Sequence, residues 1–280
     1  MQKIAILTDS ASNIAENIEK HTFVLPLYVN AGGKSRKDIV EISCTEVYEK
    51  IEHEILTTAA PSTEDFLEKI AEIKALGYDA IIGIAISSKL SATYNTMRIA
   101  LEESHIPHAL IDSKNVSFAE GFLVYYAQQL LQNNTDLQSI AKQIEEKLPN
   151  IKLIALVPDL KYLIRGGRLK PLKGFIGSML HIQPILCCGD DGKISSLDQV
   201  RGANKAIKRL AQIVQEELRS SNNYMLAILH GRHKQEIFNL KALLIDQINQ
   251  AQVYEEQAIT AVLSTQAGPD IQGVAYLKLD

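Results

Sequence analysis

The chain has 280 residues, of which 46% are hydrophobic and 22% are charged, so it can fold around one large core or two ordinary ones. Its formal net charge of −4 excludes a typical nucleic-acid-binding protein, because no basic excess is available to neutralise phosphates. Its three cysteines, Cys44, Cys187 and Cys188, form neither a disulfide framework nor a C-x-x-C motif, so we predict no metal site.

The start of the chain, MQKIAILTDS, lacks the long apolar run and the small-residue cleavage site of a secretory signal peptide. No stretch reaches the roughly 18 apolar residues that a membrane-spanning helix needs. We therefore expect a soluble cytoplasmic protein without a transmembrane segment.

The first half of the chain alternates predicted strands with predicted helices. Strands are expected over residues 3–7, 23–29, 80–86, 109–111 and 151–157, and helices are expected to begin near Ile14, Ser43, Ser62, Tyr94, Ser117 and Asp136. Such alternation is typical of a doubly wound parallel sheet. Pro26 interrupts the second strand, which removes it from the centre of the sheet, and the polar residues 32–38 are expected to form a loop.

Three of these helix starts carry capping signals. Ser43 with Glu46, and Ser117 with Glu120, have the S-x-x-E spacing of a capping box. Ser62 is positioned to cap the helix that follows it.

Hydroxyl side chains follow the strand predicted over 80–86. Ser87, Ser88, Ser91 and Thr93 stand within seven residues, just before helical spacing resumes. In an open α/β sheet, ligands bind outside the carboxyl ends of the strands, where helix N-termini favour negative charge. Ordinary capping explains any one of these hydroxyls, whereas four together favour a site for a small anionic group.

Two further segments are candidates for the same site. Asp9 and Ser10 end the first predicted strand, so we expect them at the same edge of the sheet. Residues 57–62, with the sequence TTAAPS, are a second candidate wall for a ligand, although turn chemistry explains them equally well.

The pattern changes after about Pro158. We expect a polar, glycine-rich segment over 162–168, a short mixed segment over 172–180, a hairpin of strands over 184–188 and 193–200, a helix over 207–218, a strand over 224–230, a helix through Leu240 and Leu244, and strands over 258–263 and 274–277. This half is typical of a mixed sheet with helices to one side. The predicted fold class is α/β, with a parallel-sheet domain over 1–160, a mixed-sheet domain over 161–280, and the ligand between the two.

Most enzyme signatures are missing. The sequence has no G-x-S-x-G elbow, no G-x-x-x-x-G-K-[ST] loop, no H-E-x-x-H and no G-x-G-x-x-G. Asp9, Asp112 and Asp159 sit at separate strand ends, where they are expected to act as caps. The segment 166–168, Gly-Gly-Arg, is either a phosphate-binding turn or a tight turn before a helix.

An ordered set of motifs runs through the whole chain. It consists of ILTDSASNI near the start, TTAAPST at 57–63, ISSKLSATYN at 86–95, IDSKNVS at 111–117, DLKYLIRGGRLK at 159–170, QPIL at 183–186, DGKI followed by VRG at 191–202, and STQAGPD at 264–270. In this set the chain resembles the DegV family, the bacterial fatty-acid-binding proteins called FakB.

The resemblance implies a two-domain α/β protein that holds one long-chain fatty acid. The family places the carboxylate at the domain junction and buries the acyl chain. A partner kinase subunit, FakA, phosphorylates that carboxylate with ATP to give an acyl phosphate, and the binding protein supplies no catalytic base. The resemblance thus implies a lipid-binding protein that is not an enzyme and that needs no cofactor beyond its bound lipid.

The resemblance also assigns roles to individual residues. Thr58 matches the Thr of the family's T-S-Q-P-S motif and Ser91 the second Ser of S-S-x-L-S-G-T, and both are expected to bind the carboxylate. Gln266 stands where family members usually carry the His of G-T-H-x-G-P-G, so it can donate a hydrogen bond but cannot carry charge or shuttle a proton. Ser88 and Thr93 complete the expected binding set.

The motifs also suggest residues that face a partner. Arg168 and Arg201 match two positions linked in the family to engagement of the kinase, and a guanidinium suits a phosphate or carboxylate. A surface salt bridge is the simpler explanation for either one. Other family positions are also altered: Ala59 and Ala60 replace Ser and Gln, Ala92 replaces Gly, and Asp270 replaces the final Gly of G-T-H-x-G-P-G.

Two alternative functions are compatible with the same sequence. A transferase or kinase-like subunit acting on a small polar or phosphorylated substrate is suggested by the segment 166–168, although no nucleotide-binding loop accompanies it. A non-catalytic regulator predicts that replacing Thr58 and Ser91 by alanine has no measurable effect.

Overall fold

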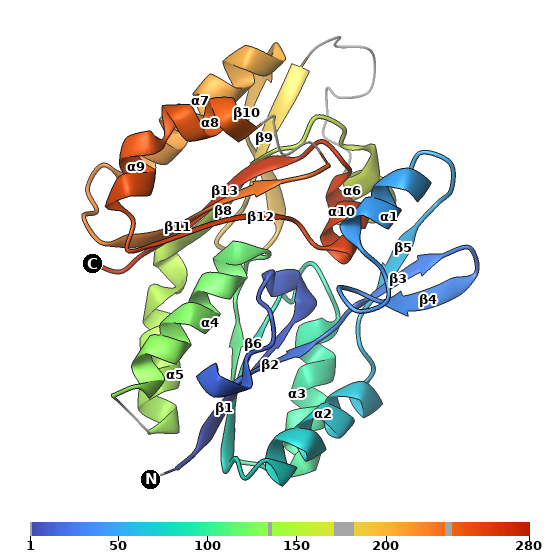
Figure 1. Cartoon of the computed structure of the whole chain (residues 1–280), viewed down its shortest axis with the longest axis vertical. Helices are drawn as coiled ribbons and strands as arrows, with labels where there is room; N and C mark the ends of the chain where they lie inside the picture. Colours follow the sequence, from blue (N-terminus) through green and yellow to red (C-terminus); the bar gives the residue numbers. More distant parts are fainter. Residues whose placement is uncertain (1, 134–135, 171–181, 233–236) are drawn as a thin grey trace.

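A computed structural model describes residues 2–133, 136–170, 182–232 and 237–280. The described residues form two large sheets, with helices outside each sheet and one helix layer between them (Figure 1). A small third sheet lies at one side, next to helices α1 (Cys44–Lys50) and α10 (Ala261–Ala267). The α/β class predicted from the sequence, with a parallel and a mixed sheet, is confirmed.

The first large sheet is entirely parallel. Its strands are β1 (Ile4–Asp9), β2 (Thr22–Leu25), β6 (Ala80–Ala85) and β7 (His108–Asp112), in the order β2-β1-β6-β7. One face packs on α2 (Thr63–Ala75) and α3 (Thr93–Ser104), and the other on α4 (Phe118–Leu131) and α5 (Leu137–Lys147). Both faces are covered, which explains why the middle of each of these strands is apolar on both sides.

The second large sheet is mixed. Its strands are β8 (Ile151–Leu156), β9 (Ile182–Cys188), β10 (Ile194–Arg201), β11 (Tyr224–His230), β12 (Val253–Ala258) and β13 (Gln272–Lys278), in the order β10-β9-β8-β13-β11-β12. The pair β11–β12 is parallel and the other pairs are antiparallel. Its outer face is covered by α7 (Ala203–Leu218), α8 (Phe238–Leu243) and α9 (Ile245–Gln250).

Helix α4 packs against both large sheets. Alternate residues of the strands face it: Ile6 of β1 and Ile82 of β6 from the parallel sheet, and Ala227 of β11 and Ala275 of β13 from the mixed sheet. All of them share one hydrophobic cluster with Phe122. One continuous core therefore spans the two sheets. The division near residue 160 stays a prediction, while strand pairing places β8 with the later strands.

The small sheet was not expected from the sequence. Its strands are β3 (Tyr28–Ala31), β4 (Lys34–Lys37) and β5 (Thr57–Ala59), in the order β4-β3-β5. Residues 32–38, predicted as a loop, instead form a hairpin that turns at Gly32 and Gly33, both with positive φ. The single strand predicted over 23–29 breaks at Pro26 into β2 and β3, which belong to different sheets. The prediction that this strand is not central is confirmed for β2, which lies at an edge of the parallel sheet, and is wrong for β3, which is the middle strand of the small sheet.

Three other predicted elements are wrong. The helix expected from Ile14 is two short 3-10 turns, Ser10–Ser12 and Ile18–Lys20. The strand expected over 258–263 is the end of β12 followed by α10. The single helix through Leu240 and Leu244 is divided into α8 and α9. In each segment apolar spacing was present, but tertiary packing selected a different local conformation.

One of the two predicted capping boxes is present. Ser43 and Glu46 cap α1 reciprocally, and Ser62 caps α2. Ser117 does not cap α4: it has φ of 61°, and its Oγ donates to Asn13 Oδ1 at 3.0 Å. A capping Ser needs extended backbone, so the left-handed conformation of Ser117 rules the box out.

The remaining elements complete the chain. A 3-10 turn over Leu148–Asn150 leads into β8, and α6 (Lys161–Arg165) occupies part of the segment predicted to be polar and glycine-rich. The hairpin β9–β10 and helix α7 are as predicted. The short mixed segment predicted over 172–180 lies outside the described residues. Among the residues described, no helix is both long and apolar enough to cross a bilayer.

Candidate functional site

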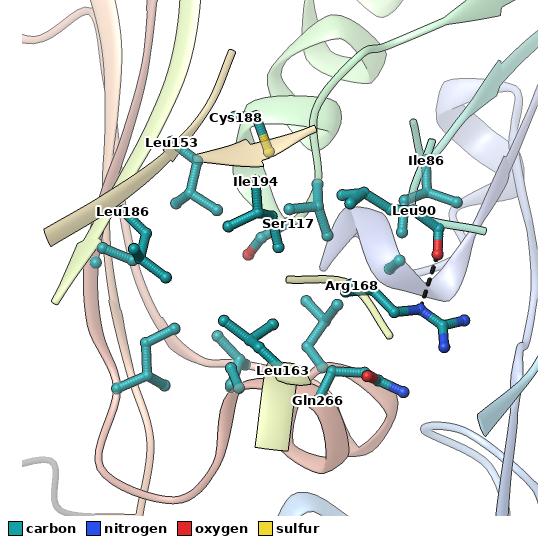
Figure 2. Close-up of a pocket in the computed structure, with 18 of the residues that line it drawn as sticks. Ile86, Leu90, Ser117, Leu153, Leu163, Arg168, Leu186, Cys188, Ile194 and Gln266 are labelled. Atoms are coloured by element: carbon teal, nitrogen blue, oxygen red, sulfur yellow. Dashed lines mark hydrogen bonds between the residues drawn. The ribbon is translucent and has the colours of Figure 1, made fainter. Parts of the chain in front are cut away.

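A pocket lies where the edge of the parallel sheet meets the inner face of the mixed sheet. Most of its lining is aliphatic and comes from both halves of the chain (Figure 2). The apolar lining consists of Ala11, Leu27, Ile86, Leu90, Val116, Leu153, Ala155, Val157, Leu163, Leu186, Ile194, Leu229, Ile259, Val262, Leu263, Ala267 and Ile271, with Gly273, Cys187 and Cys188. Thr58, Ser91, Ser117, Arg168 and Gln266 are its polar members.

The pocket has an apolar end and a polar end. Figure 2 shows Leu153 and Leu186 on one side, while the Arg168 guanidinium and the Gln266 amide point to the opposite side. This division suits an amphiphilic molecule with a long apolar body and one small polar group.

Gln266 and Thr58 meet at the polar end. Gln266 lies on α10 and Thr58 on β5, and Gln266 Nε2 donates to Thr58 Oγ1 at 2.8 Å. The Gln266 Oε1 atom is buried and has no hydrogen-bond partner among the described residues. It lies against Gly166, where a Cβ would come within 1.8 Å of it, so glycine there leaves the space for this amide.

Helix α10 is held in place by a buried acid. Asp38 accepts from Val262 N at 3.2 Å and from Ser10 Oγ at 2.7 Å, which connects the start of α10 to the end of β1. Burial raises the pKa of Asp38, although these hydrogen bonds favour the charged form. At the other end of α10, Gly268 has φ of 81° and lies so close to the Tyr162 ring that a side chain would not fit.

The predicted cluster of hydroxyls is only partly turned toward the pocket. Ser91 lines it, and the Ser91 and Thr93 hydroxyl oxygens lie 2.8 Å apart. Thr93 is fully buried behind Ser91, whose Oγ also accepts from Thr93 N at 3.3 Å. Ser87 donates to Gly192 O at 2.7 Å, which ties this loop to the β9–β10 hairpin. Ser88 does not line the pocket, and its N–H donates to Asp112 Oδ1 at 3.2 Å.

Asp9 organises the backbone beneath the pocket. Its Oδ1 accepts from Ala11 N at 2.9 Å and its Oδ2 accepts from Ile86 N at 3.0 Å. Ala11 and Ile86 both line the pocket, so one carboxyl group fixes two lining segments from neighbouring strands. Asp9 is fully buried, and burial raises its pKa to about 7.

Glu120 is the second acid at this edge, and the sequence did not reveal it. The S-x-x-E spacing predicts that Glu120 closes a capping box, but its side chain is fully buried and accepts a hydrogen bond from Thr8 Oγ1 at 3.2 Å. Burial, reinforced by the charge of Asp9, raises the pKa of Glu120 well above its usual value. Burial and the charge of Asp9 therefore both favour the protonated form of Glu120. Asp9 and Glu120 build the edge of the sheet and do not line the pocket.

The segment 166–168 ends a helix. Gly166 N donates to Tyr162 O, Gly167 N to Ile164 O, and Arg168 N to Leu163 O. Because all three amides are already paired, the geometry favours a tight turn over a phosphate-binding turn. This turn closes α6, and the helix expected after it lies outside the described residues. Arg168 extends its side chain to the pocket, and its Nε donates to Leu90 O at 3.0 Å.

Arg201 is placed differently. It is exposed at the end of β10 and does not line the pocket. The structure therefore separates the two arginines that the sequence grouped together. As for metals, the part of the chain that is described contains no group of three His, Cys, Asp or Glu side chains that could hold an ion.

Comparisons with known proteins agree with this architecture. A sequence profile of the DegV family, described as uncharacterised proteins, matches residues 3–279. A DegV domain-containing protein of Clostridium acetobutylicum is 33% identical, over 99% of this chain and 100% of that protein.

Two solved structures of similar sequence share the fold. A fatty acid binding DegV family protein from Streptococcus agalactiae superposes with a TM-score of 0.89 at 27% identity, covering 100% of both chains. DegV from Bacillus subtilis, described as a fatty acid binding protein, gives a TM-score of 0.89 at 26% identity, over 99% of this chain and 100% of that one.

Proposed function

This chain belongs to the DegV family, and from that premise we propose that it binds one long-chain fatty acid in the pocket between its two large sheets. The observation that supports this most directly is the polarity of the pocket. Aliphatic side chains line most of it, and Thr58, Ser91 and Gln266 are among its few polar lining residues, to which we assign the ligand's carboxyl group. Thr93 acts through its contact with Ser91, and Ser88 acts only through the backbone of the loop.

The chemistry of the two ends matches an acyl chain with an acid head. Burying hydrocarbon contributes about 0.8 kcal/mol for each CH₂, so a long chain supplies ample affinity. A carboxylate removed from water needs hydrogen-bond donors to offset its lost hydration. The hydroxyls of Thr58 and Ser91 can provide them.

The amide orientation of Gln266 is the one that a carboxylate favours. Because Gln266 Nε2 donates to Thr58 Oγ1, the hydroxyl hydrogen of Thr58 stays free to donate to the ligand. With the amide turned over, Thr58 would donate to Gln266 and would offer a carboxylate only lone pairs. The contact between Gln266 and Thr58 thus prepares Thr58 as a donor.

We propose that the bound fatty acid is presented to an ATP-dependent kinase of the FakA type, which forms the acyl phosphate, and that the chain itself is not an enzyme. Arg168 and Arg201 belong to the same proposal as the residues that engage this kinase, and Arg201 is exposed at the end of β10. A cytoplasmic location, where ATP is available, belongs to the same proposal.

A direct test is to identify the ligand and then remove its donors. Protein purified from cells and denatured is expected to release a long-chain fatty acid that mass spectrometry detects. Thr58→Val and Ser91→Ala are each expected to weaken binding of added stearate by roughly 10-fold or more, since a hydrogen bond to a charged group contributes about 1.5–3 kcal/mol.

Two serine variants outside the pocket serve as controls for this binding test. Ser220→Ala, on an exposed residue far along the chain, is the control, and Ser88→Ala is expected to change the affinity by less than about twofold because Ser88 does not line the pocket. Protein that carries no fatty acid and takes up none when it is added would refute the proposal. An affinity unchanged by Thr58→Val and Ser91→Ala would instead favour a regulator that does not use this end of the pocket.

A further inference from the structure

Ser117 is a polar side chain in the apolar part of the pocket. It is buried, and it lines the pocket next to Val116. Figure 2 shows its hydroxyl directed into the pocket beside Ile194, whereas the Arg168 guanidinium and the Gln266 amide point to the polar end. A hydroxyl in hydrocarbon surroundings is unfavourable unless it is hydrogen-bonded. Recognition of the carboxyl group at the polar end therefore leaves this hydroxyl without a role.

Asn13 fixes the direction of the hydrogen bond that Ser117 makes. Asn13 Nδ2 donates to Ala258 O at 3.0 Å, and because a carbonyl oxygen can only accept, this contact orients the amide. Asn13 Oδ1 then faces Ser117 Oγ at 3.0 Å, so the Ser117 hydroxyl must donate its hydrogen to Asn13. Among the described residues none donates to Ser117 Oγ in return. The lone pairs of this oxygen are therefore free to accept a hydrogen bond from a ligand.

The backbone at Ser117 has a conformation that a side chain disfavours. Its φ is 61° and its ψ is −149°, a combination that glycine adopts readily and other residues avoid. Two backbone hydrogen bonds hold it there: Ser117 N donates to Ala11 O at 2.8 Å, and Gly121 N donates to Ser117 O at 3.0 Å. Glycine would remove the strain but also the hydroxyl. Strained residues cluster at ligand-binding positions, so the serine here indicates a use for its side chain.

A free acceptor selects a ligand group that donates. Thr58 receives a hydrogen bond from Gln266 Nε2 and keeps its own hydrogen for a carboxylate, whereas Ser117 gives its hydrogen to Asn13 and keeps its lone pairs. On an acyl chain a hydroxyl group supplies the matching donor, and a keto group does not. We propose that the pocket takes a fatty acid with a hydroxyl group within its chain, and that Ser117 accepts the hydrogen bond from that hydroxyl. This inference rests on the proposed function and narrows the class of ligand.

The first test varies the ligand. Delipidated full-length protein is titrated with stearate, with the complete positional series of monohydroxystearates as single enantiomers, and with the matching oxostearates. One hydroxy isomer is expected to bind at least as tightly as stearate, because its hydroxyl reaches Ser117. Isomers whose hydroxyl faces aliphatic side chains are expected to bind about tenfold more weakly, because that hydroxyl is buried without a partner. The oxostearate that matches the favoured isomer is expected to be weakened by about the same factor, since Ser117 has no hydrogen to offer it.

The second test varies the protein and uses the ratio of two affinities, that for the favoured isomer over that for stearate. Ser117→Ala is expected to lower this ratio by about tenfold, because the ligand hydroxyl loses its acceptor. Ser117→Gly, which suits the positive φ, is expected to lower it equally and replaces the alanine variant if that one folds poorly. Ser220→Ala, on an exposed serine outside the pocket, is the matched control and is expected to leave the ratio unchanged.

Three results would overturn the inference. In the first, every hydroxystearate binds the unsubstituted protein more weakly than stearate. In the second, the preference for one isomer persists in Ser117→Ala or Ser117→Gly, so that another residue recognises the hydroxyl. In the third, the matching oxostearate binds as tightly as the favoured hydroxy isomer, so that Ser117 donates instead of accepting. A protein that binds neither stearate nor any of its derivatives would refute the proposed function itself, which is a different result.

Discussion

The two walls of the pocket are built in different ways. We use "polar-edge wall" for the lining residues Ala11, Ile86, Leu90, Ser91, Val116 and Ser117, which follow the strands of the parallel sheet, and "sheet-face wall" for Leu153, Ala155, Leu186, Ile194, Leu229 and Gly273, which lie on the mixed sheet. The first wall is made of loops held by buried polar groups. The second is made of inward-facing residues of regular strands.

This difference separates two tasks. In the polar-edge wall, Asp9 fixes the backbone of Ala11 and Ile86, and Ser87 bonds to Gly192, so the positions of its groups are set by directional contacts. In the sheet-face wall, positions are set by packing, which depends on volume and has no directional requirement. We therefore expect recognition of the head group to depend on the first wall and accommodation of the chain length to depend on the second.

We expect the largest effect from a substitution in the hydrophobic core that lies between the parallel sheet and the mixed sheet. Phe122 on α4 is fully buried in the cluster that joins the parallel and mixed sheets. Phe122→Ala is expected to lower the free energy of unfolding by about 3–5 kcal/mol, measured by chemical denaturation, because it removes a large side chain and leaves a cavity. A single cooperative transition is expected to persist, shifted to lower denaturant concentration.

Phe238→Ala is the matched control, since that phenylalanine is 57% exposed at the start of α8. We expect it to change the free energy of unfolding by less than about 0.5 kcal/mol. A separate early transition for one sheet in Phe122→Ala would contradict the idea of one shared core. It would indicate that the two units unfold independently.

The next effect tests the acids beneath the polar-edge wall. Burial raises the pKa of Glu120 well above its usual value in the folded protein, whereas in the unfolded chain Glu120 ionises near its ordinary pKa. The folded state therefore binds more protons, so Glu120 lowers the free energy of unfolding as pH rises above about 4.5. Glu120→Gln cannot ionise and is expected to gain stability relative to the unsubstituted protein over this range, by up to about 1.4 kcal/mol for each pH unit.

Chemical denaturation of both proteins at several pH values between about 4 and 7 measures this difference directly. The pKa of Asp9 is raised to about 7, so Asp9 titrates in both proteins and also lowers the free energy of unfolding as the pH rises. For this reason the two proteins are compared at each pH. Asp9→Asn is not an equivalent change, since an amide can accept only at its oxygen and would leave Ala11 N or Ile86 N unpaired. A stability difference that does not vary with pH would show that Glu120 is charged in the folded protein.

The sequence predicts the polar-edge wall better than the sheet-face wall. Hydroxyls after an apolar strand mark the carboxyl edge of a parallel sheet, and Ser91 does line the pocket. The same signal overstates the number of ligand contacts, because Ser87 and Thr93 use their hydroxyls to build the loop. From spacing alone, a hydroxyl that binds a ligand cannot be distinguished from one that binds the backbone.

The remaining features depend on contacts between distant segments. Thr58 and Gln266 are 208 positions apart in the sequence, and only the resemblance to a family brought them together. Leu186 and Ile194 look like ordinary sheet residues until the inner face of the sheet is known. Glu120 was misread because S-x-x-E spacing fits a capping box, while the left-handed backbone at Ser117 could not be foreseen.

The smallest predicted effect concerns the sheet-face wall. Ala155 on β8 lines the pocket beside Gly273, its pairing partner on the adjacent strand β13. Ala155→Leu adds volume that shortens the apolar space without touching the polar end. We expect the affinity for stearate to fall by about tenfold, the equivalent of roughly two CH₂ groups left unburied, while the affinity for decanoate changes little.

Titration with both acids, at matched pH, separates the two walls, because Ser91→Ala in the polar-edge wall is expected to weaken both acids by a similar factor. Ala155→Val adds less volume and should give a smaller loss for stearate, which keeps the test informative if the leucine variant packs poorly. Equal loss for both acids in Ala155→Leu would mean that this strand position also controls the head group. In that case the assignment of chain length to packing and of head-group recognition to directional contacts would have to be abandoned.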